Sequence, residues 1–332
     1  MRILVTGGAG FIGSHYVRRT LAGAYPAFSD VHVTVLDLLS YAGTLTNLTQ
    51  VQDSPRFRFV HGDIRDADLV SRSMAGVDLV VHFAAESHVD RSITGASDFV
   101  STNVGGTQTL LQAALEQRVG TFVHVSTDEV YGSIAEGSWS EDHVLEPNSP
   151  YAASKAGSDL IARSYHRTHG LDVRITRCSN NYGSHQFPEK VIPLFVTNLL
   201  DGRRVPLYGD GENVRDWLHV EDHCRAIALV AERGRAGEIY NIGGGTELSN
   251  RELTGRLLAA TGHDWSMVEP VADRLGHDRR YSVSTAKIAA ELGYAPTVGI
   301  DEGIAETVAW YRDNRSWWEP LKTRVAPAVL AP

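Results

Sequence analysis

A short acidic segment contains the side chains of this 332-residue chain that are best suited to acid–base chemistry. Asp128 and Glu129 are adjacent, and Thr127 precedes them. Two carboxyls held close together repel each other, so one can stay protonated as an acid while the other acts as a base. Thr127 can hydrogen-bond a reacting hydroxyl group. The alternative is that both acids are solvated loop residues or helix caps.

A glycine-rich segment near the N-terminus has the spacing of a dinucleotide-binding loop. Gly8, Gly10 and Gly13 fit the pattern G-x-G-x-x-G, and Gly7 adds a further glycine. The segment follows an expected strand and opens an expected helix, whose free N–H groups suit a phosphate. The alternative is an ordinary glycine-rich turn.

Two aspartates further along the chain indicate which dinucleotide would bind. Asp37 ends the second expected strand, where its carboxylate can accept hydrogen bonds from ribose hydroxyls and repel a 2′-phosphate. This favours NAD over NADP. Asp63 follows the third expected strand, where it could meet the adenine amino group. Helix capping by Asp63 is the alternative.

Tyr151 and Lys155 are four residues apart, which places them on the same side of a helix. Ser149 and Pro150 suit the start of that helix. A free tyrosine has a pKa of about 10. The Lys155 cation and the charge of a nicotinamide ring would lower the pKa of Tyr151 and make it a base near neutral pH. The alternative is an ordinary exposed helix face.

These residues need a scaffold, and the pattern of the first half predicts an α/β fold. Runs rich in Val, Ile, Leu and Phe predict strands at 2–6, 31–36, 57–61, 79–83, 121–126 and 173–177. Helices are expected between them at 11–22, 66–75, 98–116 and 150–169. This alternation predicts a Rossmann-type, doubly wound parallel sheet with ligands at the carboxyl ends of its strands.

The strand–helix rhythm breaks after Cys178, and we expect a smaller C-terminal substrate-binding lobe from there on. The predicted NAD-binding domain comprises residues 1–178 with a returning segment near 219–242. The predicted substrate-binding lobe comprises 179–218 and 243–320. Residues 321–332 are expected to be a flexible tail.

Composition argues against several classes of protein. Lys and Arg number 31 against 40 Asp and Glu, a net charge of −9, which is unsuited to a general nucleic-acid binder. No run of about 20 apolar residues predicts a membrane helix. Two cysteines, Cys178 and Cys224, do not make a disulfide framework, so a cytoplasmic location is expected. His219 and His223 lack the order of a metal motif, and no metal is expected.

Together these segments resemble the extended short-chain dehydrogenase/reductase superfamily and, within it, the dTDP-glucose 4,6-dehydratases. The resemblance runs from about residue 1 to about residue 318, with matching stretches at 6–15, 82–92, 126–132, 149–155, 177–183, 188–194, 209–211, 213–217 and 276–278. Asp128 with Glu129 is the specific feature, because related epimerases share the Tyr and Lys but lack these acids. One departure is the sequence GSHQ at 183–186, where the family usually has GPYQ.

The resemblance implies a reaction and a role for each candidate. Tyr151 would remove the proton of the glucose 4-hydroxyl while C4 gives a hydride to NAD⁺, with Thr127 orienting the hydroxyl and Lys155 supporting the phenolate. Glu129 would remove the C5 proton, and Asp128 would protonate the departing C6 hydroxyl. Return of the hydride to C6 would give the 4-keto-6-deoxy sugar.

The resemblance also implies binding residues and partners. Cofactor contacts are expected from Gly7, Gly10, Phe11, Ile12, Gly13, Asp37, Leu38, Leu39, Ser40, Asp63, Ile64, Phe83, Ala84, Ala85, Ser87, Thr102, Tyr151, Lys155 and Asn181. Substrate contacts are expected from Ser87, Thr127, Asn180, Lys190, Val191, Pro206, Leu207, Tyr208, Arg215, Asn250, Arg274 and His277. The implied substrate is dTDP-glucose, and a homodimer is implied through helices 98–116 and 150–169.

Two other functions stay open from the sequence. A sugar-nucleotide 4-epimerase or decarboxylase of the same superfamily would leave C6 hydroxylated or lose it as carbon dioxide. A non-catalytic protein that senses NAD(H) for a regulatory partner would not need Tyr151 and Lys155.

Overall fold

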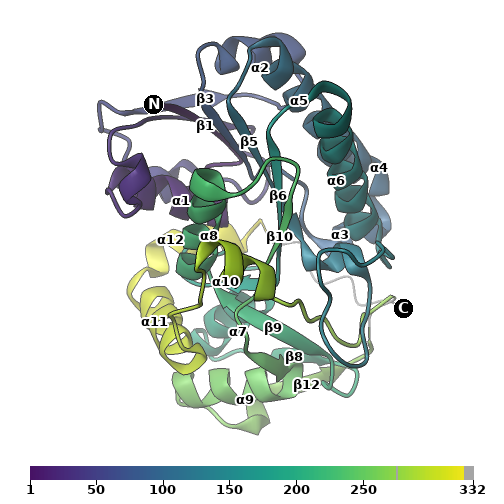
Figure 1. Ribbon diagram of the computed structural model, residues 1–332. Coiled ribbons are helices and arrows are strands. Elements are labelled where there is room, and N and C mark those ends of the chain that lie inside the picture. The colour runs from purple at the N-terminus through teal and green to yellow at the C-terminus, as the bar shows by residue number, and fades with distance from the viewer. Residues whose placement is uncertain (274–275, 325–332) are drawn as a thin grey trace.

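A seven-stranded parallel sheet forms the centre of the computed structural model, which describes residues 1–273 and 276–324 (Figure 1). Its strands, in spatial order, are β10 (Ile239–Ile242), β6 (Val173–Cys178), β5 (Thr121–Thr127), β4 (Leu79–His82), β1 (Arg2–Thr6), β2 (His32–Asp37) and β3 (Phe57–His61). The chain runs outward from β1 to β3 and then returns to β4 on the other side of β1. The strand order therefore reverses between β1 and β4, where ligands bind in open α/β sheets.

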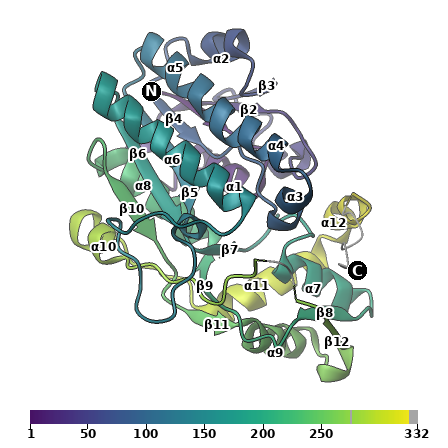
Figure 2. The same cartoon turned by 90° about the vertical axis from the view of Figure 1, so that its right-hand side faces the viewer.

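Helices cover both faces of this sheet, as the sequence predicts. Ile3 and Val5 pack with α1 (Phe11–Leu21), α8 (Val220–Arg233) and α10 (Ala286–Leu292). Leu4, which points the other way along β1, packs with α2 (Ala67–Met74), α5 (Thr107–Glu116) and α6 (Pro150–His169). Figure 2 shows α5 and α6 side by side across this second face. The doubly wound arrangement is confirmed.

The helix expected at 98–116 is interrupted. The chain forms α3 (Val89–Thr94), α4 (Ala96–Phe99), a π-helix (Val100–Gly106) and only then α5. Asn103 lies in the π-helix, where its amide bonds the backbone of Glu86 in both directions and donates to Ser154 Oγ at 2.8 Å. Two glycines at the end of this segment favour the wider turn, and π-turns often occur at functional sites.

A second region lies below the sheet in Figure 1 and has its own apolar core. It contains a three-stranded sheet of β7 (Asn180–Tyr182), β9 (Val214–His219) and β11 (Glu247–Ser249), and a parallel pair of β8 (Val205–Tyr208) with β12 (Val268–Val271). Its helices are α7 (Val191–Leu200), α9 (Asn250–Thr261), α11 (Ile300–Asp313) and α12 (Arg315–Lys322). The exact division into two lobes stays a prediction, although α8 and β10 join the large sheet.

The predicted flexible tail, 321–332, begins too early in the chain. Leu321 and Lys322 belong to α12, where Leu321 is buried and Lys322 pairs with Asp201 at 2.8 Å. An apolar side chain at the end of the helix holds this turn against the body. Residues 325–332 lie outside the described residues. Within the described part of the chain, no helix is long and apolar enough to cross a membrane.

Candidate active site

One cavity of about 790 Å³ opens at the carboxyl ends of the central strands. It is bordered by the glycine loop after β1, by the segments after β2, β3 and β4, by the acidic segment after β5, and by residues 178–190. Every predicted cofactor residue borders it except Leu39. Leu39 packs its side chain on the apolar core, and its backbone N–H donates to Asp37 Oδ1. Leu39 therefore positions the Asp37 carboxylate instead of contacting the cavity.

The glycine loop has a shape that only glycine supports. Gly7 has a φ of +70°, and a Cβ there would lie 2.5 Å from the backbone nitrogen of Ala84. A Cβ on Gly13 would lie 2.3 Å from the carbonyl oxygen of Gly7, so α1 packs directly against the loop. No side chain caps the start of α1, which leaves the first N–H groups at the cavity suited to an anion.

The two predicted adenosine-side acids differ in their environment. Asp37 is buried and accepts from the backbone N–H of Ala9 at 2.9 Å, which ties the end of β2 to the glycine loop. Burial raises the pKa of Asp37. Asp63 forms two-pronged contacts with Arg65, which lower its pKa. Asp66, and not Asp63, caps α2, so the helix-cap alternative for Asp63 is wrong.

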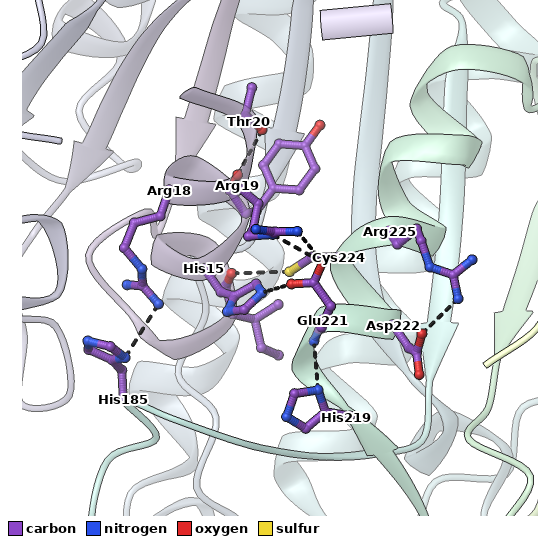
Figure 3. Close-up of polar contacts among 12 residues, drawn as sticks. His15, Arg18, Arg19, Thr20, His185, His219, Glu221, Asp222, Cys224 and Arg225 are labelled. Carbon is purple, nitrogen blue, oxygen red and sulfur yellow. Dashed lines mark hydrogen bonds and ion pairs between the residues drawn. The ribbon is translucent and has the colours of Figure 1, made fainter. Parts of the chain in front are cut away.

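Helix α1 is clamped to α8 by a group of charged side chains (Figure 3). Glu221 on α8 lies 2.7 Å from His15 Nε2 and 2.9 Å from Arg19 on α1. His219 caps the start of α8 by accepting from the Glu221 N–H. These contacts were not foreseen from the sequence, and they fix the helix that carries the glycine loop.

The departure from the family pattern at 183–186 lies at the edge of the same group. His185 has a φ of +66° and stacks on Trp310, with a ring distance of 4.3 Å. Its Nδ1 lies 3.4 Å from Arg18 on α1 (Figure 3). Burial lowers the pKa of His185 to about 3, so the ring is neutral. The substituted loop thus contacts the helix behind the cofactor residues and not the catalytic residues.

The five predicted catalytic residues all border the cavity. The strand β5 ends at Thr127, and a 3-10 turn (Asp128–Tyr131) presents the two acids at the sheet edge. Ser149 accepts from the Ala152 N–H and starts α6, as predicted, which sets Tyr151 in the first turn. Thr127 Oγ1 donates to Asp128 Oδ1 at 3.3 Å and accepts from the Glu129 N–H.

Asp128 has the environment of a neutral acid. Its side chain is 1% exposed, and one carboxyl oxygen has no hydrogen-bond partner among the described residues. Burial raises its pKa well above the usual value, and the neighbouring Glu129 and Asp216 raise it further. Arg215 and a hydrogen bond from Thr127 oppose this effect only in part. Asp128 can therefore carry a proton at neutral pH.

The expected lowering of the Tyr151 pKa by Lys155 and a nicotinamide charge stays a prediction, because the protein surroundings alone have the opposite effect. Burial raises the pKa of Tyr151, and Glu129 raises it further, while the Thr127 hydroxyl lowers it. Lys155 donates to the carbonyl of Val125 at 2.8 Å, and burial lowers its pKa to about 8. The spacing of Tyr151 and Lys155 predicts that they share one face of the helix. It does not predict how deeply they are buried, and burial decides the direction of each pKa shift.

The predicted substrate residues divide into two groups. Ser87, Thr127, Asn180 and Lys190 border the cavity, and Lys190 Nζ donates to the Ser87 carbonyl at 2.8 Å. The structure does not bring the others into its wall: Val191, Pro206, Leu207, Tyr208, Arg215, Asn250 and His277. Arg274 lies outside the described residues.

Arg215 does not offer a free fork to a diphosphate. Its two terminal nitrogens donate to the carbonyls of Val214 and Asp278, and its guanidinium lies 4.2 Å from the Tyr281 ring centre. His277 pairs with Asp273 at 2.6 Å. These contacts lie in the second region, where tertiary packing and not the motif determines what each side chain faces.

Several residues of the wall were missed from the sequence. They include Tyr41, Glu86, Arg91 and Glu189, and Arg91 lies 3.7 Å above the Tyr41 ring and 3.4 Å from Glu189. His223 was set aside with the metal motif, yet its Nδ1 lies 2.8 Å from Asn181 Oδ1 at the cavity. Within residues 1–273 and 276–324, no group of three or more His, Cys, Asp and Glu side chains is arranged for a metal ion.

Comparisons with known proteins agree with the geometry. Residues 4–307 match the family described as GDP-mannose 4,6 dehydratase. A dTDP-glucose 4,6-dehydratase of Streptomyces antibioticus is 65% identical, over 100% of this chain and 98% of the relative.

Solved structures of a dehydratase and an epimerase are also similar to this chain. DesIV, a dTDP-glucose 4,6-dehydratase from Streptomyces venezuelae with NAD and TYD bound, is 69% identical with a TM-score of 0.96, covering 97% of this chain and 100% of that one. A UDP-glucose 4-epimerase from Thermotoga maritima is 32% identical with a TM-score of 0.86, covering 95% of this chain and 100% of that one. The chain therefore belongs to the dTDP-glucose 4,6-dehydratase family of NAD-dependent epimerases and dehydratases.

Proposed function

We propose that this protein is an NAD-dependent hydro-lyase that converts dTDP-glucose to dTDP-4-keto-6-deoxyglucose, a step of deoxysugar biosynthesis. The observation that carries the proposal is the buried Asp128, whose pKa burial raises, beside Glu129 in the cavity that Thr127 and Tyr151 also border. An epimerase needs only a proton acceptor at one hydroxyl. Elimination of water needs a base and a separate acid, and this cavity contains both.

The cavity fits NAD through features of the chain itself. Gly7 and Gly13 leave no room for a Cβ where the pyrophosphate would pass, and the start of α1 offers uncapped N–H groups. Asp37 lies at the end of β2 and favours a ribose with a free 2′-hydroxyl. NAD supplies the hydride chemistry when bound, since it takes up a hydride and gives it back within one turnover.

Tyr151 and Thr127 act on the 4-hydroxyl of the glucose ring. Both side chains border the same cavity, so one hydroxyl of the sugar can contact both. The Tyr151 phenolate accepts the hydroxyl proton as C4 is oxidised, and Thr127 orients the oxygen. Lys155, one turn along α6, supports the phenolate with its positive charge.

Glu129 and Asp128 carry out the elimination. The 4-ketone makes the C5 proton acidic, and Glu129 takes that proton. Asp128 gives its own proton to the C6 hydroxyl, the C6–O bond breaks, and water leaves. The hydride then adds to C6 and a proton returns to C5, so the sugar is neither oxidised nor reduced overall.

The test is incubation of the purified protein, without added coenzyme, with dTDP-glucose and separately with UDP-, CDP- and GDP-sugars. Mass spectrometry of the product should show loss of one water from dTDP-glucose. A product of unchanged mass would identify an epimerase, and loss of carbon dioxide from a sugar acid would identify a decarboxylase. Absence of any turnover with a bound dinucleotide would favour the sensor.

We also propose that the protein is a cytoplasmic homodimer. Val100 of the π-helix and Leu160 of α6 are large apolar side chains, each 55% exposed, on two elements that pack together. Both cysteines are free and buried, which agrees with a reducing compartment. Sedimentation at micromolar concentration should give twice the chain mass, and Leu160→Glu should give the monomer.

A further inference from the structure

A set of buried charged groups continues from the cavity into the core along α6. Lys155 and Asp159 are one helical turn apart, and Arg177 faces them from β6. Their side chains are 4%, 0% and 1% exposed. Arg177 Nε donates to Asp159 Oδ2 at 2.9 Å. The reaction described above uses Lys155 but assigns nothing to the other two.

The remaining titratable groups around Lys155 are uncharged or border the cavity. His124 on β5 lies 3.3 Å from Asp159, and burial lowers the pKa of His124 and of His82 on β4, so both rings are neutral. Burial raises the pKa of the Cys178 thiol on β6. In the turn after β5, burial raises the pKa of Asp128, which favours its neutral form, and Glu129 and Tyr151 border the cavity.

The fully buried charges are therefore unbalanced. Lys155 and Arg177 are cations, and Asp159 is the one carboxylate among these groups that is both fully buried and ionised. An uncompensated buried charge is costly. A phenolate at Tyr151, on the same face of α6, would supply the missing negative charge. The core beneath the cavity is thus arranged to accept one further negative charge.

We propose that Asp159 is a positioning residue for the reaction, and that its carboxylate, held by Arg177, keeps Lys155 protonated and so allows Tyr151 to lose its proton. The proposal rests on the proposed role of Tyr151 as the base. It assigns a function to a buried ion pair that would otherwise only stabilise the fold.

The protonation states agree with this arrangement. Burial lowers the pKa of Lys155 to about 8, and Asp159 opposes that change. Burial would raise the pKa of Asp159, but Arg177 and the nearby His124 hold it at about 2. Asp159 therefore stays ionised at any working pH. Without its charge, the pKa of Lys155 would fall further, and the phenolate would lose part of its counter-charge near pH 7.

The pKa of Lys155 can be measured directly, because the chain contains only four lysines. The test is a pH titration of the full-length protein labelled with ¹³C at lysine Cε, in which NMR follows four signals and Lys155→Gln assigns one of them. Asp159→Asn should lower the Lys155 pKa by roughly one unit or more. Arg177→Met leaves the Asp159 charge unopposed and should raise the Lys155 pKa. Shifts of the Lys155 pKa in opposite directions in the two variants would show that Asp159 acts through its charge.

The same variants should shift the alkaline limb of the pH profile of kcat/KM, Asp159→Asn toward acid and Arg177→Met toward alkali. The control is Asp172→Asn, which removes another Asp–Arg pair, with Arg174 at 2.7 Å, at the far end of β6. It should leave the Lys155 pKa unchanged.

An unchanged Lys155 pKa in both folded variants, or shifts in the same direction, would overturn the proposal. If Asp159→Asn does not fold, Arg177→Met decides alone. Failure of the proposed function is separate, because it would appear as wild-type protein that does not dehydrate dTDP-glucose.

Discussion

The two sides of the cavity are held by different physical means. On the side of the glycine loop, backbone shape dominates, because Gly7 and Gly13 pack too closely for any side chain. On the side of Tyr151 and Asp128, buried titratable groups dominate, and the pKa of each depends on its neighbours. Substitutions on the glycine-loop side should therefore impair function by steric overlap at every pH. Substitutions on the Tyr151 side should impair it by changing protonation, with the shape of the cavity intact.

Tyr151→Phe should have the largest effect on the electrostatic side. Removal of the phenol oxygen removes the base for the first oxidation, so turnover should fall by about 10³-fold or more while bound NAD is retained. The measurement is NADH formation on mixing with dTDP-glucose. Tyr165→Phe is the control, because Tyr165 lies on the same helix but bonds Gln112 outside the cavity. A Tyr151→Phe protein with normal turnover would contradict the role of base.

Asp128→Asn should separate the two halves of the reaction. The first oxidation does not use Asp128, so NADH should still form. Elimination needs the proton that the amide lacks, so it should slow by about 10²-fold or more. Rapid-quench analysis should show the 4-keto sugar with its C6 hydroxyl still present. Wild-type dehydration across the pH range would show that Asp128 is not the acid.

Gly7→Ala tests the steric side. A left-handed φ costs an L-residue roughly 1–2 kcal/mol, and the overlap with the Ala84 backbone adds to this, so the loop must change shape and the site for NAD is distorted. NAD content of the purified protein and its affinity by calorimetry should both fall, equally at pH 6 and pH 8. A pH-dependent loss would contradict the distinction between the two sides.

The stability of the protein should reveal the cost of Asp128. Its pKa is raised in the folded state, so its contribution to stability is present at low pH and is lost as pH rises above the unfolded value of about 4. Asn carries no such penalty. The melting temperature of Asp128→Asn should therefore equal that of the wild type at pH 4 and exceed it at pH 8. Asp63→Asn, where Arg65 lowers the pKa, should not show this gain.

Glu221→Gln should have the smallest effect. It weakens the clamp between α1 and α8 at a partly exposed site, where ion pairs contribute about 1 kcal/mol or less. The melting temperature should decrease by a few degrees, and NAD affinity should change little. A large loss of NAD affinity would show that the shape of the glycine loop depends on this clamp as well.

Local patterns predicted much of the fold and the first side of the cavity. The six expected strands form within one or two residues of their positions, and the glycine loop needs no distant partner to be recognised. The break of helix 98–116 into a π-helix was not predictable, because it depends on contacts of Asn103 with Glu86 and Ser154. Likewise, the resemblance implied a substrate contact by Arg215, whose guanidinium donates to the carbonyls of Val214 and the distant Asp278.

The sequence by itself determined which chemical groups exist and the order of the segments that carry them: the glycines, the Thr-Asp-Glu run, and a tyrosine and lysine one turn apart. Residue type and local periodicity are enough for that, since both act over a few positions. Only the tertiary structure decided the protonation of those groups. The pKa values of Asp128, Tyr151 and Lys155 depend on burial and on charges from separate strands, and no local pattern records that depth.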